Sequence, residues 1–172
     1  TQVSYTAFPT AYFYNSRLHP EYAMVKSLED TAGKHVSILA GTTFFENIIS
    51  ENGGILQKVK SEDQVLKMLW GGRVDFAHSG LVTGLETIST VPKYKDLKPF
   101  EFMVTKLQGG LMFRKGSYKI RDIFVKKIRE LHKSGELEKI YAHALKAIPM
   151  IQAKHMVPDE IDIRINADQW YP

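Results

Sequence analysis

Gly41, Thr42 and Thr43 are the residues whose types and spacing point most directly to a binding chemistry. They stand where the strand-like sequence HVSILAG meets the helix-like sequence TTFFENIIS. The start of a helix carries unpaired backbone N–H groups and a partial positive charge, and glycine lets a ligand approach the backbone closely. The three residues therefore predict a site for a carboxylate or a similar anion, although they also fit an ordinary N-cap beside a turn glycine.

His78, Ser79 and Gly80 end a second strand-like segment, 74–80, and are expected to line the same cleft. Neighbouring residues of a strand point to opposite faces, so His78 and Ser79 form a poor nucleophile–base pair. The sequence also has no Gly-x-Ser-x-Gly elbow. We therefore expect no catalytic residue, and for His78 a pocket-lining role and a structural role both stay open.

Metal and cofactor chemistry have no support in the sequence. The chain has no cysteine, which excludes disulfides and thiolate ligands, and its six histidines show no metal-binding pattern. His132 and His143 would lie about 16 Å apart on one continuous helix, too far to share a metal. We expect neither a metal site nor a cofactor.

Composition and charge limit the kinds of partner that this chain is expected to bind. The chain has 172 residues, 44% of them hydrophobic, and a net charge of +4. Its most basic stretch, 115–133, is interrupted by Asp122 and Glu130, which favours a solvated helix face over a nucleic-acid or membrane contact. No apolar run reaches the ~20 residues of a membrane helix, and no signal peptide is visible in this chain. We expect no nucleic-acid partner and no membrane insertion.

Strand-like and helix-like segments alternate along the chain. The strand-like segments are 10–15, 35–41, 55–60, 74–80, one within 109–117, and 160–166; the helix-like segments are 42–54, 61–72, 81–90, 117–133 and 136–145. This alternation predicts an α/β fold with a largely parallel sheet.

Local signals predict how some of these helices begin and which side they bury. Thr43 with Glu46, and Ser61 with Gln64, have the spacing of a capping box. In the long helix, five apolar residues at helical spacing form one stripe that should face the core: Ile120, Ile123, Phe124, Ile128 and Leu131. The segment between Pro92 and Pro99 is expected to be a polar loop.

Three segments occur in a fixed order: SLEDTAGKHVSILAGTT, then SEDQVLKMLWGGRVDFAHS, then GGLMFRKGSYKIRDIFVKKIRELHKSGELEKIYAHAL. In this order they resemble the bacterial family-3 extracellular solute-binding proteins, the type II periplasmic binding proteins of amino-acid ABC transporters. The motifs that carry the resemblance lie at 34–36, 41–43, 72–75, 114–117 and 135–140. The similarity covers about residues 10–146.

The resemblance implies a type II periplasmic-binding-protein-like lobe, with a mainly parallel sheet flanked by helices and C-terminal helices that return to a partial first lobe. Two strands, at 12–14 and 111–114, would cross between the lobes. The parts expected are a hinge strand and remnant of lobe 1 at 1–15, lobe 2 at 16–110, the second hinge strand with the C-terminal helices at 111–146, and an extra tail at 147–172.

Two departures from the family pattern affect the expected function. Most of the N-terminal lobe has no counterpart in this chain. Gly80 stands where amino-acid binders carry an aspartate for the ligand ammonium, so Glu86 or another acid would have to substitute, or the ligand would lack an amine. Asp75, from the same motif, is expected to be structural.

The resemblance implies a periplasmic or extracytoplasmic solute-binding protein or sensor module. It would bind a small anionic solute, amino-acid-like or a simple carboxylate, and serve an ABC transporter permease or a sensor protein. The alternatives are a ligand-free interaction domain, with a homo-oligomer as one form, a fragment of a longer sensor, or an enzyme on the same scaffold that uses His78 and Glu86.

Overall fold

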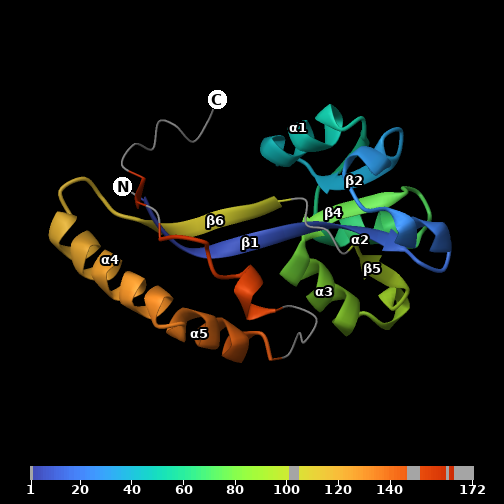
Figure 1. The fold of residues 1–172 in the computed structure, drawn as a ribbon. Helices are drawn as coiled ribbons and strands as arrows, with labels where there is room; N and C mark the ends of the chain where they lie inside the picture. Colours follow the sequence, from blue (N-terminus) through green and yellow to red (C-terminus); the bar gives the residue numbers. More distant parts are fainter. Residues whose placement is uncertain (1, 101–104, 147–151, 162, 165–172) are drawn as a thin grey trace. The chain divides into compact units, whose positions relative to one another are not determined.

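The computed structural model describes residues 2–100, 105–146, 152–161 and 163–164 (Figure 1). The chain forms two compact units, which we call the central unit, Pro9–Thr105, and the terminal unit, Thr1–Phe8 with Lys106–Pro172. One long strand, β1 (Gln2–Asn15), contributes residues to both.

The division between the units falls after Phe8 and after Thr105. The resemblance implied crossings between lobes at 12–14 and 111–114. β1 pairs with other strands in both units, so it continues through the division without a turn or a break. A crossing inside an unbroken strand leaves no local signal in the sequence.

The central unit is built on a sheet whose strand order, in the described residues, is β3-β2-β4-β1-β5. β2 is parallel to β3 and β4, while β1 is antiparallel to β4 and β5, so every strand except β1 points the same way. The predicted α/β class with a mainly parallel sheet is confirmed. The elements are η1 Pro20–Met24, η2 Glu29–Thr31, β2 His35–Leu39, α1 Thr43–Glu51, β3 Ile55–Val59, α2 Glu62–Trp70, β4 Phe76–Gly80, α3 Leu81–Thr90, η3 Pro92–Tyr94 and β5 Leu97–Pro99.

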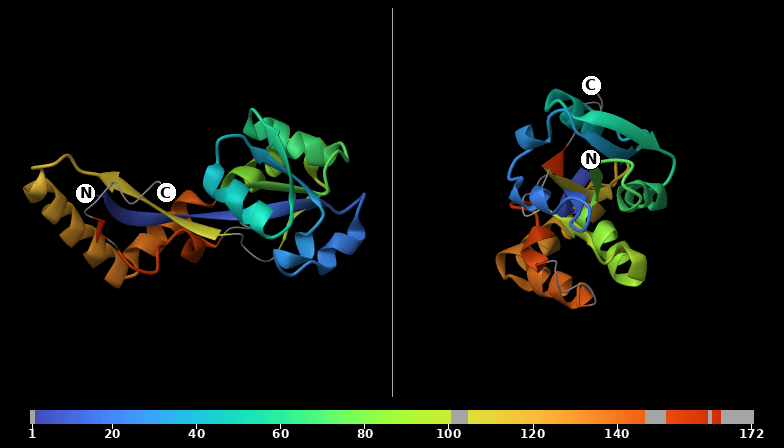
Figure 2. Two further views of the ribbon diagram at one scale, coloured as in Figure 1. Left: turned by 90° about the horizontal axis from the view of Figure 1, so that it is seen from above. Right: turned by 90° about the vertical axis from the view of Figure 1, so that its right-hand side faces the viewer.

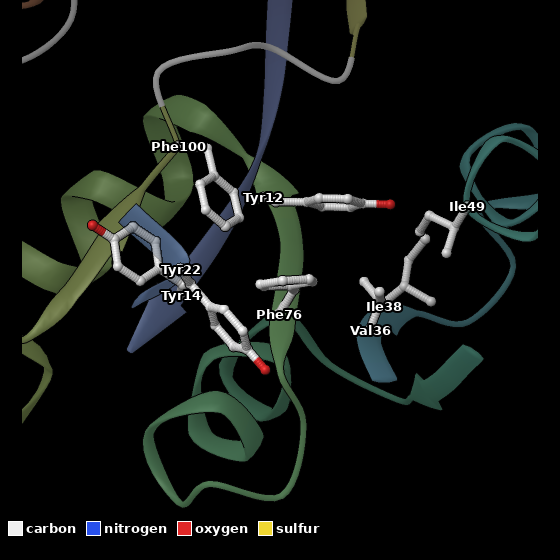
Figure 3. Close-up of a cluster of buried hydrophobic side chains, with 8 residues drawn as sticks. All are labelled: Tyr12, Tyr14, Tyr22, Val36, Ile38, Ile49, Phe76 and Phe100. Carbon is white, nitrogen blue, oxygen red and sulfur yellow. The ribbon is translucent and has the colours of Figure 1, made fainter. Parts of the chain in front are cut away.

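One face of this sheet packs against α1. Val36 pairs with Phe76 across β2 and β4, and Tyr12 pairs with His78 across β1 and β4, so these four side chains share a face. Ile49 of α1 belongs to the same buried cluster, which is largely aromatic (Figure 3). One part of the core of the central unit therefore lies between α1 and this face of the sheet.

The opposite face packs against α2 and α3. Ser37 of β2 points to this face, and its hydroxyl donates to the carbonyl of Val65 in α2 at 3.0 Å. Gly84 of α3 lies directly against the ring of Phe13, which is fully buried. Figure 1 shows α1 and α3 on opposite sides of the strands. The helices that follow β2 and β4 thus leave the sheet in opposite directions.

The terminal unit combines the first part of β1 with two more strands and two helices. β6 (Thr105–Met112) and β7 (Ile163–Arg164) both pair with β1. α4 (Tyr118–Lys133) and α5 (Glu136–Ala144), drawn in orange, lie on the same side of β1 and β6 (Figure 2), and a short turn, η4 (Ala153–His155), follows. The buried core residues are Val3, Val125, Ile128, Leu137 and Ile161.

The predicted apolar stripe of α4 is only partly correct. Ile128 is buried, with Phe124 and Leu131 packed beside it, but the side chains of Ile120 and Ile123 are 66% and 64% exposed. The buried side of the helix also includes Val125. At 100° per residue, Ile123 lies about 160° around the helix from Val125, so both cannot face one core.

The bounds of β1, β5 and β7 also differ from the predicted ones. β1 begins at Gln2 rather than at residue 10, and β5 occupies part of the segment expected to be a loop. Of the strand expected at 160–166, residues 163–164 are in β7; residues 162, 165 and 166 lie outside the described residues. Short strands such as β5 depend on pairing with a neighbour, which local sequence does not encode.

Candidate functional site

The candidate site lies at the carboxyl ends of β2 and β4, which are neighbours in the central sheet. The chain leaves β2 toward α1 on one face and leaves β4 toward α3 on the other face. Open α/β sheets bind ligands at such a point of divergence. All the predicted site residues lie here: Gly41, Thr42 and Thr43 follow β2, and His78, Ser79 and Gly80 end β4.

Gly41 already holds an anionic group, which the chain itself supplies. Its φ of 87° suits glycine, and its N–H donates to Glu46 Oε1 at 3.1 Å. The Lys58 ammonium lies 2.6 Å from the other carboxylate oxygen, Oε2. The hydrogen bond from Lys58, helped by the N–H groups of Gly41 and Thr42, lowers the pKa of Glu46, so this carboxyl group is ionised at neutral pH.

Thr42 and Thr43 have different positions at the start of α1. Thr42, not Thr43, is the N-cap, and its hydroxyl donates to the carbonyl of Leu39 at 2.6 Å instead of capping the helix. The predicted capping box at Thr43 is therefore wrong: the N-cap is one residue earlier, and its side chain makes no cap hydrogen bond. Thr43 is exposed, and its N–H and that of Phe44 have no intrahelical acceptor, because the first N–H groups to bond the Thr42 carbonyl are those of residues 45 and 46.

The second predicted capping box does not form, although its N-cap residue is the expected one. Ser61 is the N-cap of α2, as expected, but its side chain makes no cap hydrogen bond. Gln64 does reach back, and its Oε1 accepts the N–H of Lys60 at 3.0 Å. Lys60 precedes the N-cap, so this hydrogen bond is not the one that a capping box makes to the N–H of the N-cap residue.

His78 is buried beneath the first turn of α1. Its side chain is 5% exposed, and its ring contacts the ring of Tyr12, with centroids 5.9 Å apart, and the ring of Phe45, at 4.5 Å. Its Nε2 has no hydrogen-bond partner among the described residues. Burial lowers its pKa from 6.5 to about 4, so the imidazole is neutral at neutral pH.

Ser79 points away from His78, as strand alternation predicted. Its hydroxyl donates to Glu62 Oε2 of α2 at 3.2 Å, on the sheet face opposite His78. Glu86 belongs to α3, which packs on that opposite face and not beside His78. The structure therefore assembles neither a Ser79–His78 pair nor a His78–Glu86 pair.

Gly80 and Asp75 lie at opposite ends of β4, with Asp75 just before its first residue and Gly80 as its last. Gly80 is the N-cap of α3, and an added Cβ would meet nothing closer than Thr83 Oγ1 at 3.5 Å. Asp75 accepts a hydrogen bond from Tyr22 Oη at 2.6 Å and one from the His35 N–H at 2.8 Å. Asp75 thus ties η1 to the starts of β2 and β4, a structural role that the sequence predicted.

Sequence reasoning missed the contribution of Lys58 and Glu62 to this edge of the sheet. The capping-box spacing drew attention to Glu46, but nothing local marked its partner on β3. Within the described residues, no group of three or more histidine, cysteine, aspartate or glutamate side chains could hold a metal ion. No helix in the described part of the chain has the length and apolar character needed to cross a membrane.

Solved structures share this fold. YckB of Bacillus subtilis superposes with a TM-score of 0.65 at 15% identity, covering 91% of this chain and 62% of that chain. A histidine kinase sensor domain with similarity to periplasmic binding proteins gives 0.61 at 21%, covering 84% and 64%. The L-cystine solute receptor of Neisseria gonorrhoeae, in its unliganded open conformation, gives 0.59 at 19%, covering 80% and 58%.

These similarities show the fold of the periplasmic binding proteins, which the sequence resemblance implied. The chain spans 58–64% of the length of the three structures. No protein-family model and no curated protein matches the sequence.

Proposed function

We propose that this chain, which has the fold of the periplasmic binding proteins, is a non-catalytic module that binds a small anionic solute at the N-terminus of α1. The observation that carries the proposal is the exposed Thr43 at the divergence of β2 and β4, with two N–H groups beside it that lack intrahelical acceptors. Its hydroxyl adds a further donor. The positive end of the helix favours a negatively charged group there.

The partners follow from the kinds of protein that share the fold. One similar structure is a solute receptor and another is a sensor domain of a histidine kinase. We propose that the solute is passed to an ABC transporter permease or reported to a sensor protein, outside the cytoplasm. His78 and Gly80 would border the solute without contributing charge.

A ligand-free interaction domain is the second candidate, and one observation favours it. The inner donor of the loop, the Gly41 N–H, is occupied by Glu46, which leaves fewer donors for a solute. An enzyme on this scaffold has less support, because His78 and Glu86 belong to opposite faces of the sheet.

Thr43→Ala should weaken binding of the anionic solute by about 1–3 kcal/mol, because the charged group of the solute would lose a hydrogen-bond donor. Calorimetric titration against α-amino acids, and against small carboxylates and phosphates without an amine, would measure this. Thr43→Ser keeps the hydroxyl and should bind like the wild type. Equal affinities for Thr43→Ala and the wild type would remove Thr43 from the site, and no binding by the wild type would favour the interaction domain.

Gly80→Asp should shift specificity toward solutes that carry an amine. A Cβ at position 80 would make only ordinary van der Waals contact with Thr83, and a carboxylate there would offer a counter-charge to an ammonium group. Affinity for amino acids should rise about tenfold relative to amine-free carboxylates, which corresponds to ~1.4 kcal/mol. Gly80→Asn, of similar size and neutral, is the matched control; an equal shift in both variants would contradict the electrostatic explanation.

A further inference from the structure

We propose that the turn at Gly41 and Thr42, together with Lys58, is a carboxylate-binding site, and that Glu46 is its internal occupant and competes with the anionic group of a solute. The competition rests on the proposed function. The site itself can be tested without any solute, so the two can fail separately.

The fold brings the parts of this site together. Glu46 lies one helical turn after the N-cap Thr42, and helix side chains lean toward the N-terminus, so its carboxylate returns to the turn that precedes α1. The Ala40 N–H donates to the Val59 carbonyl at 2.8 Å, which holds this turn beside the end of β3, where Lys58 lies.

The donors are of the kind that recognises carboxylates in general. Glu46 Oε1 accepts the Gly41 N–H at 3.1 Å, and Oε2 accepts a hydrogen from Lys58 Nζ at 2.6 Å. A backbone N–H at a positive-φ turn and an ammonium group together form a small anion site. These contacts involve only the carboxylate of Glu46, so a free carboxylate could make the same contacts.

The site can exchange its occupant without unfolding the sheet. The Glu46 side chain is 11% exposed, but that of Lys58 is 51% exposed, so the site is open to solvent on the Lys58 side. Rotation of the Glu46 side chain would vacate the Gly41 N–H and leave Lys58 free to follow an incoming anion. While Glu46 stays in place, a solute reaches only the outer donors, at Thr43 and Phe44.

An intramolecular occupant is a strong competitor, because tethering gives it an effective concentration that reaches the millimolar range even for flexible linkers. Removing Glu46 should therefore do two things. It should let a small free carboxylate bind at the turn, and it should raise the affinity for an anionic solute.

Glu46→Ala with sodium formate is the direct test. Its unfolding temperature should rise with formate concentration, relative to sodium chloride at equal ionic strength, and the rise should exceed that of the wild type. Glu51→Ala, which removes an exposed carboxylate from the same helix, is the matched control. Adding Lys58→Met to Glu46→Ala should abolish the effect. A formate response no larger than that of Glu51→Ala would overturn the proposal.

Glu46→Gln is the second variant, for the case in which Glu46→Ala does not fold. It keeps the shape of the side chain and one hydrogen-bond acceptor, and removes the charge. Glu46→Ala should bind the anionic solute on the order of tenfold more tightly than the wild type. Glu46→Gln should also bind it more tightly, but by less, because its amide oxygen can still accept the Gly41 N–H. A formate response without solute binding in any variant would overturn the proposed function and the competition, and would leave the carboxylate site standing. Solute binding that is unchanged in both Glu46 variants would overturn the competition and keep the proposed function.

Discussion

Replacing His78 with leucine should remove most of an acid-dependent loss of stability and leave stability at pH 7 equal or higher. His78 is buried, and its Nε2 has no hydrogen-bond partner in the described residues. The groups that face it are the ring of Tyr12 from β1 and the ring of Phe45 from α1. Leucine removes both the unpaired nitrogen and the titrating group, while it keeps an apolar side chain in the core.

The sign and size of this pH dependence of stability follow from the pKa of His78, which burial lowers from 6.5 to about 4. Between pH 6.5 and pH 4, His78 is protonated in the unfolded chain but neutral in the folded chain, so a fall in pH favours unfolding. Between pH 7 and pH 5 the wild type should lose about 2 kcal/mol through this group, and the loss should reach about 3 kcal/mol below pH 4. Urea unfolding at pH 7, 6 and 5 would measure the free energy of unfolding.

His78→Gln is the control, because it removes the titration but keeps a polar side chain in the core. Its stability should depend on pH as weakly as that of the leucine variant, and it should be less stable than that variant at pH 7. Carboxyl groups that titrate near pH 5 are common to all three proteins and cancel in the comparison. The same pH slope in the wild type and in both variants would show that His78 is not the group responsible.

Gly84→Val should lower the free energy of unfolding by about 3 kcal/mol, because it places a branched side chain in a filled core. A Cβ at Gly84 would lie 2.3 Å from Phe13 Cζ and 2.7 Å from Cε2, and the Phe13 ring is fully buried. The close approach seats α3 on the sheet and so positions Gly80 at the candidate site. Chemical denaturation followed by circular dichroism would measure the loss.

Two further variants separate the clash from other effects. Ser89→Val places the same β-branched residue at an exposed position of α3, and should cost less than about 1 kcal/mol. Phe13→Leu combined with Gly84→Val should be more stable than the sum of the single changes predicts, because the smaller side chain relieves the contact. Strict additivity would mean that Phe13 is not what restricts position 84.

The turn at 41–43 shows how much of the candidate site can be predicted from local sequence. Strand-like residues, a glycine and a helix start are local signals, so the sequence predicted a loop able to hold an anion. The structure shows an anion there, that of Glu46. Its partner Lys58 lies twelve residues further on, and reaches it because β3 pairs in parallel with β2. A contact that depends on strand pairing cannot be predicted from the sequence of either segment alone.

The sequence by itself determined the order of most helices and strands, the mainly parallel sheet and the opposite directions of His78 and Ser79. Each of these depends on periodicity within a few residues. Only the tertiary structure decided which helix covers which face, that His78 is buried and neutral, and that Ile123 of α4 stays exposed. These outcomes depend on which surfaces meet, and that is a property of packing between distant segments rather than of any one segment.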